Sequence, residues 1–135
     1  MNYISTRNNQ NNYTFKEVFL KGLADDGGLF VPRSIKQFKK EELDDLKRIS
    51  YNDLAAEIIY PFIGDFMTKD ELISLISKSY SNFRSNDVVK ISNLGNLKVL
   101  ELFHGPTLAF KDIAMQLIGN FYQYHLGHDQ KKINI

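Results

Sequence analysis

Residues 103–118, FHGPTLAFKDIAMQLI, place one lysine in an apolar run of helical spacing that directly follows a Gly-Pro turn. An ammonium group is costly to desolvate, so a lysine at a core-like position needs a reason. Lys111 comes soon after Gly105-Pro106, where the positive end of a helix dipole and partial burial disfavour the ammonium form. Such a lysine is a better nucleophile and can form a Schiff base with a carbonyl cofactor. The alternative is a solvated Lys-Asp pair on the helix surface.

Two other groups could do chemistry, and each has a simpler interpretation. His125 and His128 form an His-x-x-His pair without an evident third ligand. We therefore predict surface histidines and no metal site. The glycine amides of Asp25-Asp26-Gly27-Gly28 could cradle an anion, but two adjacent carboxylates oppose this. A helix C-cap followed by a turn is the favoured interpretation.

The first eighty residues are predicted to be mainly helical. Thr14 and Glu17 match a capping box, which predicts a helix over about 15–24 that the following DDGG sequence ends. Ser50 can cap a second helix, and Thr68 opens a third. Each is followed by apolar residues at helical spacing.

Short strands are expected at Tyr3–Thr6 and Leu29–Val31. The character of the chain changes in the polar stretch 82–87. After it, Val88–Ile91 and Leu97–Phe103 flank an Asn/Gly turn, which predicts a hairpin or a pair of neighbouring strands.

The residues after Gly105-Pro106 carry a strong signal for an amphipathic helix. Its expected apolar positions are Phe110, Ile113, Ala114, Leu117, Ile118 and Phe121. The helix is expected to end near Leu126-Gly127, and a further strand to begin at Lys132–Ile135, giving the strand-helix-strand order of a βαβ unit.

The composition is that of a globular protein: 135 residues, 43% of them hydrophobic, with a net charge of +1. This balance gives no electrostatic pull toward nucleic acid or an anionic membrane, so neither partner is expected. The absence of cysteine excludes disulfides and thiolate metal sites. No signal peptide or membrane span is evident, and a cytoplasmic location is expected.

Three segments resemble one family and occur in that family's order along the chain. YISTR at 3–7, KGLADDGGLFVP at 21–32 and ELFHGPTLAFKD at 101–112 closely resemble segments of threonine synthase. The resemblance implies an α/β fold in two parts. Residues 1–83 would form a mainly helical N-terminal subdomain with short strands, and residues 84–135 the beginning of a truncated fold-type II pyridoxal-phosphate domain.

The same resemblance implies a pyridoxal-phosphate-dependent lyase that converts O-phospho-L-homoserine and water to L-threonine and phosphate. Lys111 corresponds to the lysine that holds the cofactor as an internal aldimine, so it is the expected catalytic and cofactor-binding residue. Its freed amine would shuttle protons at the substrate Cα and Cβ. His104 and Thr107 flank this lysine and are expected to line the pocket, without an assigned step.

Family members continue after a strand like KKINI at 131–135 into a Ser/Thr/Gly-rich loop that holds the cofactor phosphate. Residues 1–135 alone are therefore expected to bind pyridoxal phosphate weakly and to be inactive. The alternatives are a non-catalytic remnant or interaction module, and another fold-type II lyase, which the match of HGPTLAFKD disfavours. Unpaired strand edges and an exposed helix stripe predict a homo-oligomer formed through residues 88–135.

Overall fold

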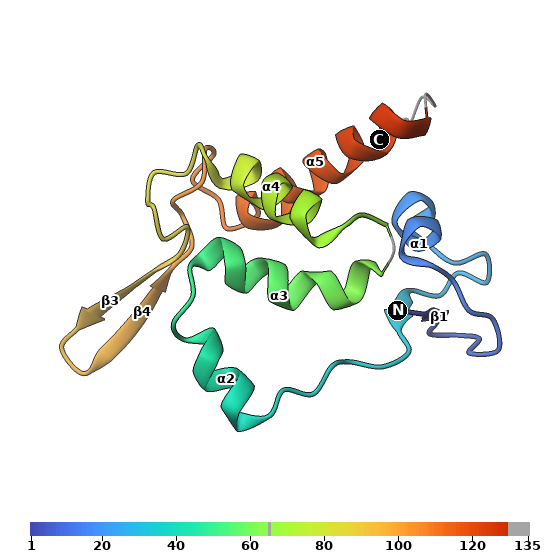
Figure 1. The fold of residues 1–135 in the computed structure, drawn as a ribbon, viewed down its shortest axis with the longest axis horizontal. Helices are drawn as coiled ribbons and strands as arrows, with labels where there is room; N and C mark the ends of the chain where they lie inside the picture. Colours follow the sequence, from blue (N-terminus) through green and yellow to red (C-terminus); the bar gives the residue numbers. More distant parts are fainter. Residues whose placement is uncertain (65, 130–135) are drawn as a thin grey trace. The chain divides into compact units, whose positions relative to one another are not determined.

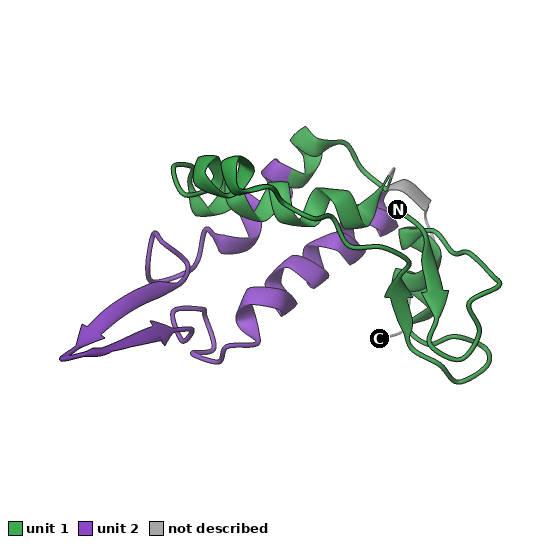
Figure 2. Ribbon diagram, turned by 90° about the horizontal axis from the view of Figure 1, so that it is seen from below, with its two compact units in different colours: residues 1–72 green, residues 73–135 purple. Residues whose placement is uncertain are grey.

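The structure is a computed structural model that describes residues 1–64 and 66–129 (Figure 1). The chain divides into two compact units, Met1–Leu72 and Ile73–Ile135, coloured separately in Figure 2. The expected α/β class is confirmed, because five helices occur together with two antiparallel pairs of strands in the described residues. The predicted subdomain boundary between residues 83 and 84 stays a prediction.

Two short strands lie near the start of unit 1. Strand β1 (Tyr3–Ser5) pairs antiparallel with β2 (Phe30–Pro32), and Ile4 lies opposite Val31 in the register. The hydroxyl of Tyr3 donates a hydrogen bond of 2.8 Å to the carbonyl oxygen of Phe62, far away in the sequence. Both predicted strands are therefore confirmed, and β1 is tied to the helical part of its unit.

Helix α1 (Phe15–Lys21) begins at the predicted capping box and ends earlier than predicted. The Thr14 amide donates to Glu17 Oε2 at 2.7 Å, and the Glu17 amide donates to Thr14 Oγ1 at 3.3 Å. Gly22 ends the helix with a φ of +73°, and its amide donates to the Val18 carbonyl at 3.0 Å. The predicted end near residue 24 is wrong, because Gly22 takes a backbone conformation that leaves the helix.

Helices α2 (Lys40–Leu46), α3 (Tyr51–Ile63) and α4 (Lys69–Tyr80) follow. The sequence predicted α3 and α4 but not α2. The α2 sequence, KEELDDL, carries apolar side chains only at Leu43 and Leu46, which is too few for a clear helical period. The Glu42 carboxylate supports its first turn by accepting a hydrogen bond of 2.8 Å from the Lys39 amide.

The predicted caps of the two longer helices are confirmed. The Asp53 amide donates to Ser50 Oγ at 3.2 Å at the start of α3. At the start of α4, the Thr68 amide donates to Glu71 Oε2 at 2.8 Å. The core of unit 1 lies beside these helices, and its buried side chains include Val18, Ala56, Ile63, Met67 and Leu72.

We expect Ser50→Ala to lower the free energy of unfolding by about 1 kcal/mol, because the first turn of α3 loses its side-chain cap. Urea denaturation measures this difference. Ser77→Ala is the matched control, because Ser77 is an exposed residue inside α4. The control should be neutral or slightly stabilising, since alanine has the higher helix propensity. Equal losses in the two variants would contradict the role of the cap.

Unit 2 contains a hairpin and the last helix. Strands β3 (Lys90–Leu94) and β4 (Leu97–Glu101) pair antiparallel from Lys90 opposite Glu101 to Leu94 opposite Leu97. Gly95 occupies the two-residue turn with a φ of +59°, which favours glycine. The predicted strand pair is confirmed.

Helix α5 (Asp112–Asp129) packs against the unit 2 part of α4. The hydroxyl of Tyr80 donates to the Ile113 carbonyl at 2.9 Å, and Asn120 Nδ2 donates to Ser79 Oγ at 2.8 Å. Leu117 is buried in this unit. These polar and apolar contacts fix the helix that follows the candidate lysine.

Three expectations for this helix are wrong. It begins at Asp112, so Phe110 lies outside it and is exposed rather than part of a buried stripe. It continues beyond the predicted end at 126–127. His125 is buried, although a surface position was predicted. The strand predicted at 132–135 lies outside the described residues. No described helix combines the length and apolarity that a membrane span requires.

Candidate functional site

Residues 102–111 connect β4 with α5, and the segment from Gly105 to Asp112 places Lys111 directly before the first helical residue. The Leu108 amide donates to the Gly105 carbonyl at 3.1 Å, and the Asp112 amide donates to the Ala109 carbonyl at 3.0 Å. Leu108 has a φ of +64°, which side chains of its size rarely adopt. The segment is therefore sharply bent just ahead of Lys111.

Asp112 is the internal anchor of this segment. Its side chain is only 4% exposed. The amide and the hydroxyl of Thr107 each donate a hydrogen bond of 2.8 Å to its carboxylate. A Cβ atom on Gly105 would lie 2.3 Å from the Asp112 Cβ, so only glycine allows this close approach. Thr107 and Gly105 thus fix the position of the residue that follows Lys111.

Lys111 is exposed, so its predicted partial burial is wrong for this chain. Its predicted place at the start of the helix is confirmed, because its carbonyl accepts the amide of Met115 at 2.9 Å. Within residues 1–64 and 66–129, its Nζ atom has no hydrogen bond or ion pair. The neighbouring Asp112 carboxylate is bound to Thr107 instead, so the alternative of a Lys-Asp pair is not formed. The Lys111 amine is therefore exposed to solvent and has no ion-pair partner among the described residues.

His104 is held by a carboxylate that the sequence did not single out. His104 Nε2 lies 2.8 Å from Glu101 Oε2, and the other carboxylate oxygen of Glu101 accepts from the Ser92 hydroxyl. These two hydrogen bonds hold the pKa of Glu101 below its ordinary value, and the bond from Ser92 has the larger effect. Both residues that flank Lys111 in the motif are thus held in place, His104 by Glu101 and Thr107 by Asp112.

We expect the hairpin to weaken in acid through Glu101. Its pKa is lower in the folded chain than the ordinary value of 4.5, so the ionised carboxylate stabilises the hairpin above that pH. This contribution is lost as the pH falls through the folded pKa. Backbone NMR signals of β3 and β4, followed from pH 7 to pH 3, report the loss. In Glu101→Gln the step should disappear, and an unchanged step would contradict the assignment.

The glycine amides of the Asp25–Gly28 turn already have acceptors, because the Gly27 amide donates to the Ala24 carbonyl at 2.9 Å and the Gly28 amide donates to the Asp26 side chain. Asp26 Oδ1 accepts hydrogen bonds of 2.8 Å from the Gly28 amide and from Ser5 Oγ. The amide of Gly28, and then the Ser5 hydroxyl, lower the pKa of Asp26. The Arg7 guanidinium donates to the Asp26 carbonyl at 3.0 Å. The turn therefore joins β1 to the start of β2, which confirms the predicted turn. The predicted helix C-cap at 25–28 is wrong, because Gly22 already caps α1.

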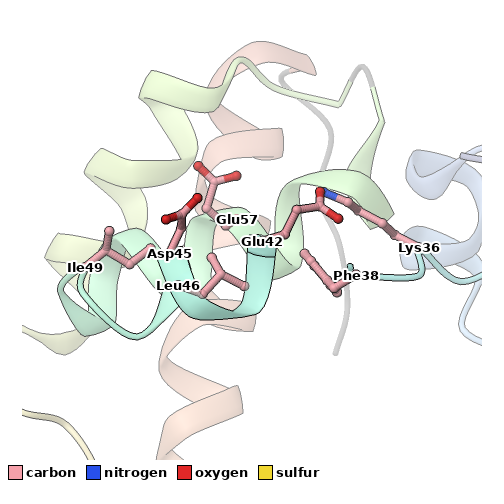
Figure 3. Close-up of a pocket in the computed structure, with 7 residues that line it drawn as sticks. All are labelled: Lys36, Phe38, Glu42, Asp45, Leu46, Ile49 and Glu57. Carbon is pink, nitrogen blue, oxygen red and sulfur yellow. The ribbon is translucent and has the colours of Figure 1, made fainter. Parts of the chain in front are cut away.

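A shallow pocket of about 260 Å³ lies in unit 1 beside α2 and α3 (Figure 3). Lys36 Nζ lies 3.2 Å from Glu42 Oε1 and 4.5 Å from the ring centroid of Phe38, so its cation already has partners. Hydrogen bonds from the Lys39 amide and from Lys36 lower the pKa of Glu42. Within the described residues no group of three metal-ligating side chains occurs, there or elsewhere.

The comparisons with known proteins agree with the motifs. The family model "Threonine synthase N terminus" matches residues 2–80. Threonine synthase of Schizosaccharomyces pombe is 43% identical over 128 residues, which are 93% of this chain and 25% of that protein.

Solved structures extend the similarity to the fold. Pyridoxal-phosphate-bound threonine synthase from Brucella melitensis matches 98% of this chain and 29% of its own, with 38% identity and a TM-score of 0.92. Threonine synthase from yeast matches 93% of this chain and 26% of its own, with 42% identity and a TM-score of 0.88. The chain thus spans between a quarter and three tenths of the length of these three relatives.

Proposed function

Because the chain belongs to the threonine synthase family, we propose that it is the N-terminal part of a pyridoxal-phosphate-dependent lyase. The proposed reaction converts O-phospho-L-homoserine and water to L-threonine and phosphate. The observation that carries the proposal is the exposed amine of Lys111 at the start of α5, where the hydrogen bond from the Thr107 amide to Asp112 fixes the neighbouring backbone. A lysine whose only role was to be solvated would not require the buried Thr107–Asp112 hydrogen bonds beside it.

The residues present fit the aldehyde end of the cofactor. Lys111 offers an exposed primary amine, and the Thr107–Asp112 hydrogen bonds fix the backbone beside it. When bound, pyridoxal phosphate supplies an electron sink that stabilises negative charge at a substrate carbon. A Brucella relative with the same fold in this region is described as bound to this cofactor.

The phosphate end of the cofactor needs other residues. The first amides of α5 are already used, because Asp112 and Ile113 donate to the carbonyls of Ala109 and Phe110. They are not available as the anion site that a helix N-terminus often provides. In our proposal, the phosphate is held by the part of a threonine synthase that follows the matched region.

The chain's own residues then have distinct roles. Lys111 holds the cofactor through its amine and, when released, moves protons at the Cα and Cβ atoms of the substrate. Asp112 and Thr107 keep Lys111 at a fixed place, and Glu101 orients the ring of His104. Asp112, Thr107, Glu101 and His104 are therefore positioning residues in the proposal, and Lys111 is the catalytic residue.

A chimeric enzyme tests this function. Residues 1–135 replace the matched N-terminal quarter of S. pombe threonine synthase, and phosphate release and threonine formation are measured with O-phospho-L-homoserine. We expect turnover at least a hundredfold above that of the S. pombe protein lacking its first quarter, since oriented binding of the reacting groups contributes factors of this size. A folded chimera that binds the cofactor without turnover would contradict the proposal.

Residues 1–135 alone are expected to form no threonine, even with added pyridoxal phosphate. The physical reason is that an amine without oriented phosphate and substrate sites forfeits several kcal/mol of catalysis. The measurement is phosphate release compared with a Lys111→Ala control. Release above that control would show that the 135 residues contain a complete site.

A further inference from the structure

The imidazole ring of His104 is bound to a carboxylate through one nitrogen only. Its Nε2 atom lies 2.8 Å from Glu101 Oε2, and both side chains are only 17% exposed. The hydroxyl of Ser92 donates to the other oxygen of the same carboxylate. Within residues 1–64 and 66–129, the Nδ1 atom of His104 has no hydrogen bond. Because Glu101 accepts from Nε2, Nδ1 is the ring nitrogen that can exchange a proton with a ligand.

The backbone places His104 near the candidate lysine. Gly105 directly follows His104, and Asp112 directly follows Lys111. A Cβ atom on Gly105 would lie 2.3 Å from the Asp112 Cβ, so the two backbones meet at this contact. The Cα atoms of His104 and Lys111 are therefore at most about 13 Å apart, because consecutive Cα atoms are about 3.8 Å apart. One small substrate between the two side chains can contact both.

The charged residues that these contacts place around His104 favour an anion. The cations are Arg84, Lys90 and Lys111, and the carboxylates are Glu101 and Asp112. Both carboxylates already accept hydrogen bonds from hydroxyl groups within unit 2. Arg84 is tied to His104 directly, because its amide donates to the His104 carbonyl at 2.8 Å, and its side chain is exposed. A doubly charged anion is therefore attracted to this part of the chain.

The proposed reaction needs a proton at the leaving phosphate. A phosphate monoester carries a charge of about −1.5 to −2 at neutral pH, because its second pKa is about 6. If the bond between Cγ and the bridging oxygen broke without proton transfer, the leaving group would be a phosphate trianion. A positioned acid avoids this unfavourable product. Lys111 is assigned the protons at Cα and Cβ, so a second group is needed for the phosphate.

We propose that His104 is a second catalytic residue, which binds the phosphoryl group of the substrate through Nδ1 and gives it a proton as it leaves. Glu101 is the positioning residue that holds the ring. This inference rests on the proposed function and adds a proton transfer to the positioning role of His104. The phosphoryl group is that of O-phospho-L-homoserine and not that of the cofactor.

The proton balance of the step closes on His104. The bond between Cγ and the bridging oxygen breaks, its electron pair stays on that oxygen, and the Nδ1 proton of protonated His104 passes to the phosphate. The neutral imidazole then takes up the proton that water releases when its oxygen bonds to Cβ. His104 thus ends each turnover protonated, and no oxidant or reductant is involved.

A leaving group that needs no proton tests the step. In the chimeric enzyme, His104→Gln keeps an amide N–H that can donate to Glu101 but has no proton to transfer. This variant should lower kcat for O-phospho-L-homoserine at least about a hundredfold. With 2-amino-4-chlorobutanoate, from which chloride leaves unprotonated, it should change kcat less than about threefold. Its cofactor content, read from visible absorbance, should equal that of the unmodified chimera.

Phosphate binding is measured without turnover. Residues 1–135 with 15N-labelled histidine are titrated with inorganic phosphate, and sodium chloride of equal ionic strength is the reference. The NMR signals of the His104 ring should shift until they saturate. His125 is the internal control, because it is only 4% exposed and should not respond.

Three results would overturn the proposal. Equal losses of kcat with the two substrates would mean that His104 only supports the site, and an unchanged kcat would mean that it takes no part. A His104 ring that does not respond to phosphate is the third. The proposed function is judged separately, by the unmodified chimera. If that chimera binds the cofactor without turnover, the function is contradicted, and the phosphate titration still decides whether His104 binds the phosphoryl group.

Discussion

Lys111→Ala in the chimeric enzyme is expected to lower kcat/KM for O-phospho-L-homoserine by at least about a thousandfold. The variant removes the amine that holds the cofactor and the group that moves protons, and positioned acid-base catalysis alone contributes factors of this order. The backbone of the segment should remain, because its internal hydrogen bonds run between Thr107 and Asp112. Steady-state phosphate release measures the loss.

Two controls separate nucleophilicity from charge. Lys111→Arg keeps a cation at the same place, but a guanidinium stays protonated and cannot act as an amine nucleophile. It should be as inactive as the alanine variant. Lys47→Ala removes an exposed lysine that pairs with Asp44 in unit 1, and it should leave turnover unchanged. Full turnover in Lys111→Arg would contradict the proposed role.

Covalent labelling gives a readout that does not depend on turnover. When residues 1–135 are incubated with pyridoxal phosphate and reduced with borohydride, peptide mapping should find Lys111 as the preferred site. Lys111 is exposed and has no ion pair in the described residues, whereas Lys21 and Lys69 are held in ion pairs. The preference over the other exposed lysines follows from the family motif, in which Lys111 corresponds to the lysine that holds the cofactor. Label spread evenly over the lysines would contradict a selective site.

The helix starts could be predicted because their stabilising contacts are local. The Thr14–Glu17 and Ser50–Asp53 pairs each place a cap and its partner three residues apart, so the pattern is visible in the sequence. The hairpin was predictable for a similar reason, because two β-rich runs flank a short turn. The end of α1 was missed because the DDGG sequence at 25–28 is the more obvious stop signal, whereas Gly22, with a φ of +73°, already ends the helix.

The candidate site was only partly predictable. The family motif identifies Lys111, but the support of its position depends on contacts that a linear pattern does not show. Asp112 reaches back five residues to Thr107 around a bend at Leu108, so the helix begins after Phe110 rather than with it. The Glu101 contact with Ser92 depends on the strand register, which a pair of predicted strands does not specify.

The exposure of Lys111 shows a different limit. Apolar periodicity predicts which face of a helix can be covered, but the cover itself comes from other parts of a protein. Leu117 is buried within the described chain, whereas Phe110 and Met115 are exposed. Phe110 and Met115 therefore fit an apolar pattern in the sequence, while the described chain leaves them in contact with solvent.

Gly105→Ala is expected to disrupt the support of Lys111 without changing any reacting group. The added Cβ would lie 2.3 Å from Asp112 Cβ and 2.4 Å from its Oδ2 atom, so Asp112 must move away from Thr107. Overpacking and the loss of hydrogen bonds to a buried carboxylate together cost about 2–4 kcal/mol of unfolding free energy. Displacement of the neighbouring Lys111 should lower kcat/KM of the chimera about a hundredfold.

Gly119→Ala is the matched control, because it makes the same substitution inside α5 at a position where a Cβ would meet no atom within 4 Å. Alanine has the higher helix propensity by about 1 kcal/mol, so this variant should be as stable as the parent or more stable. Urea denaturation of residues 1–135 and turnover of the chimera measure both variants. If Gly105→Ala matched Gly119→Ala in both measurements, the contact between Gly105 and Asp112 would not be what positions Lys111. If Gly105→Ala lost stability but kept full turnover, Asp112 would support the fold alone and would not position the amine.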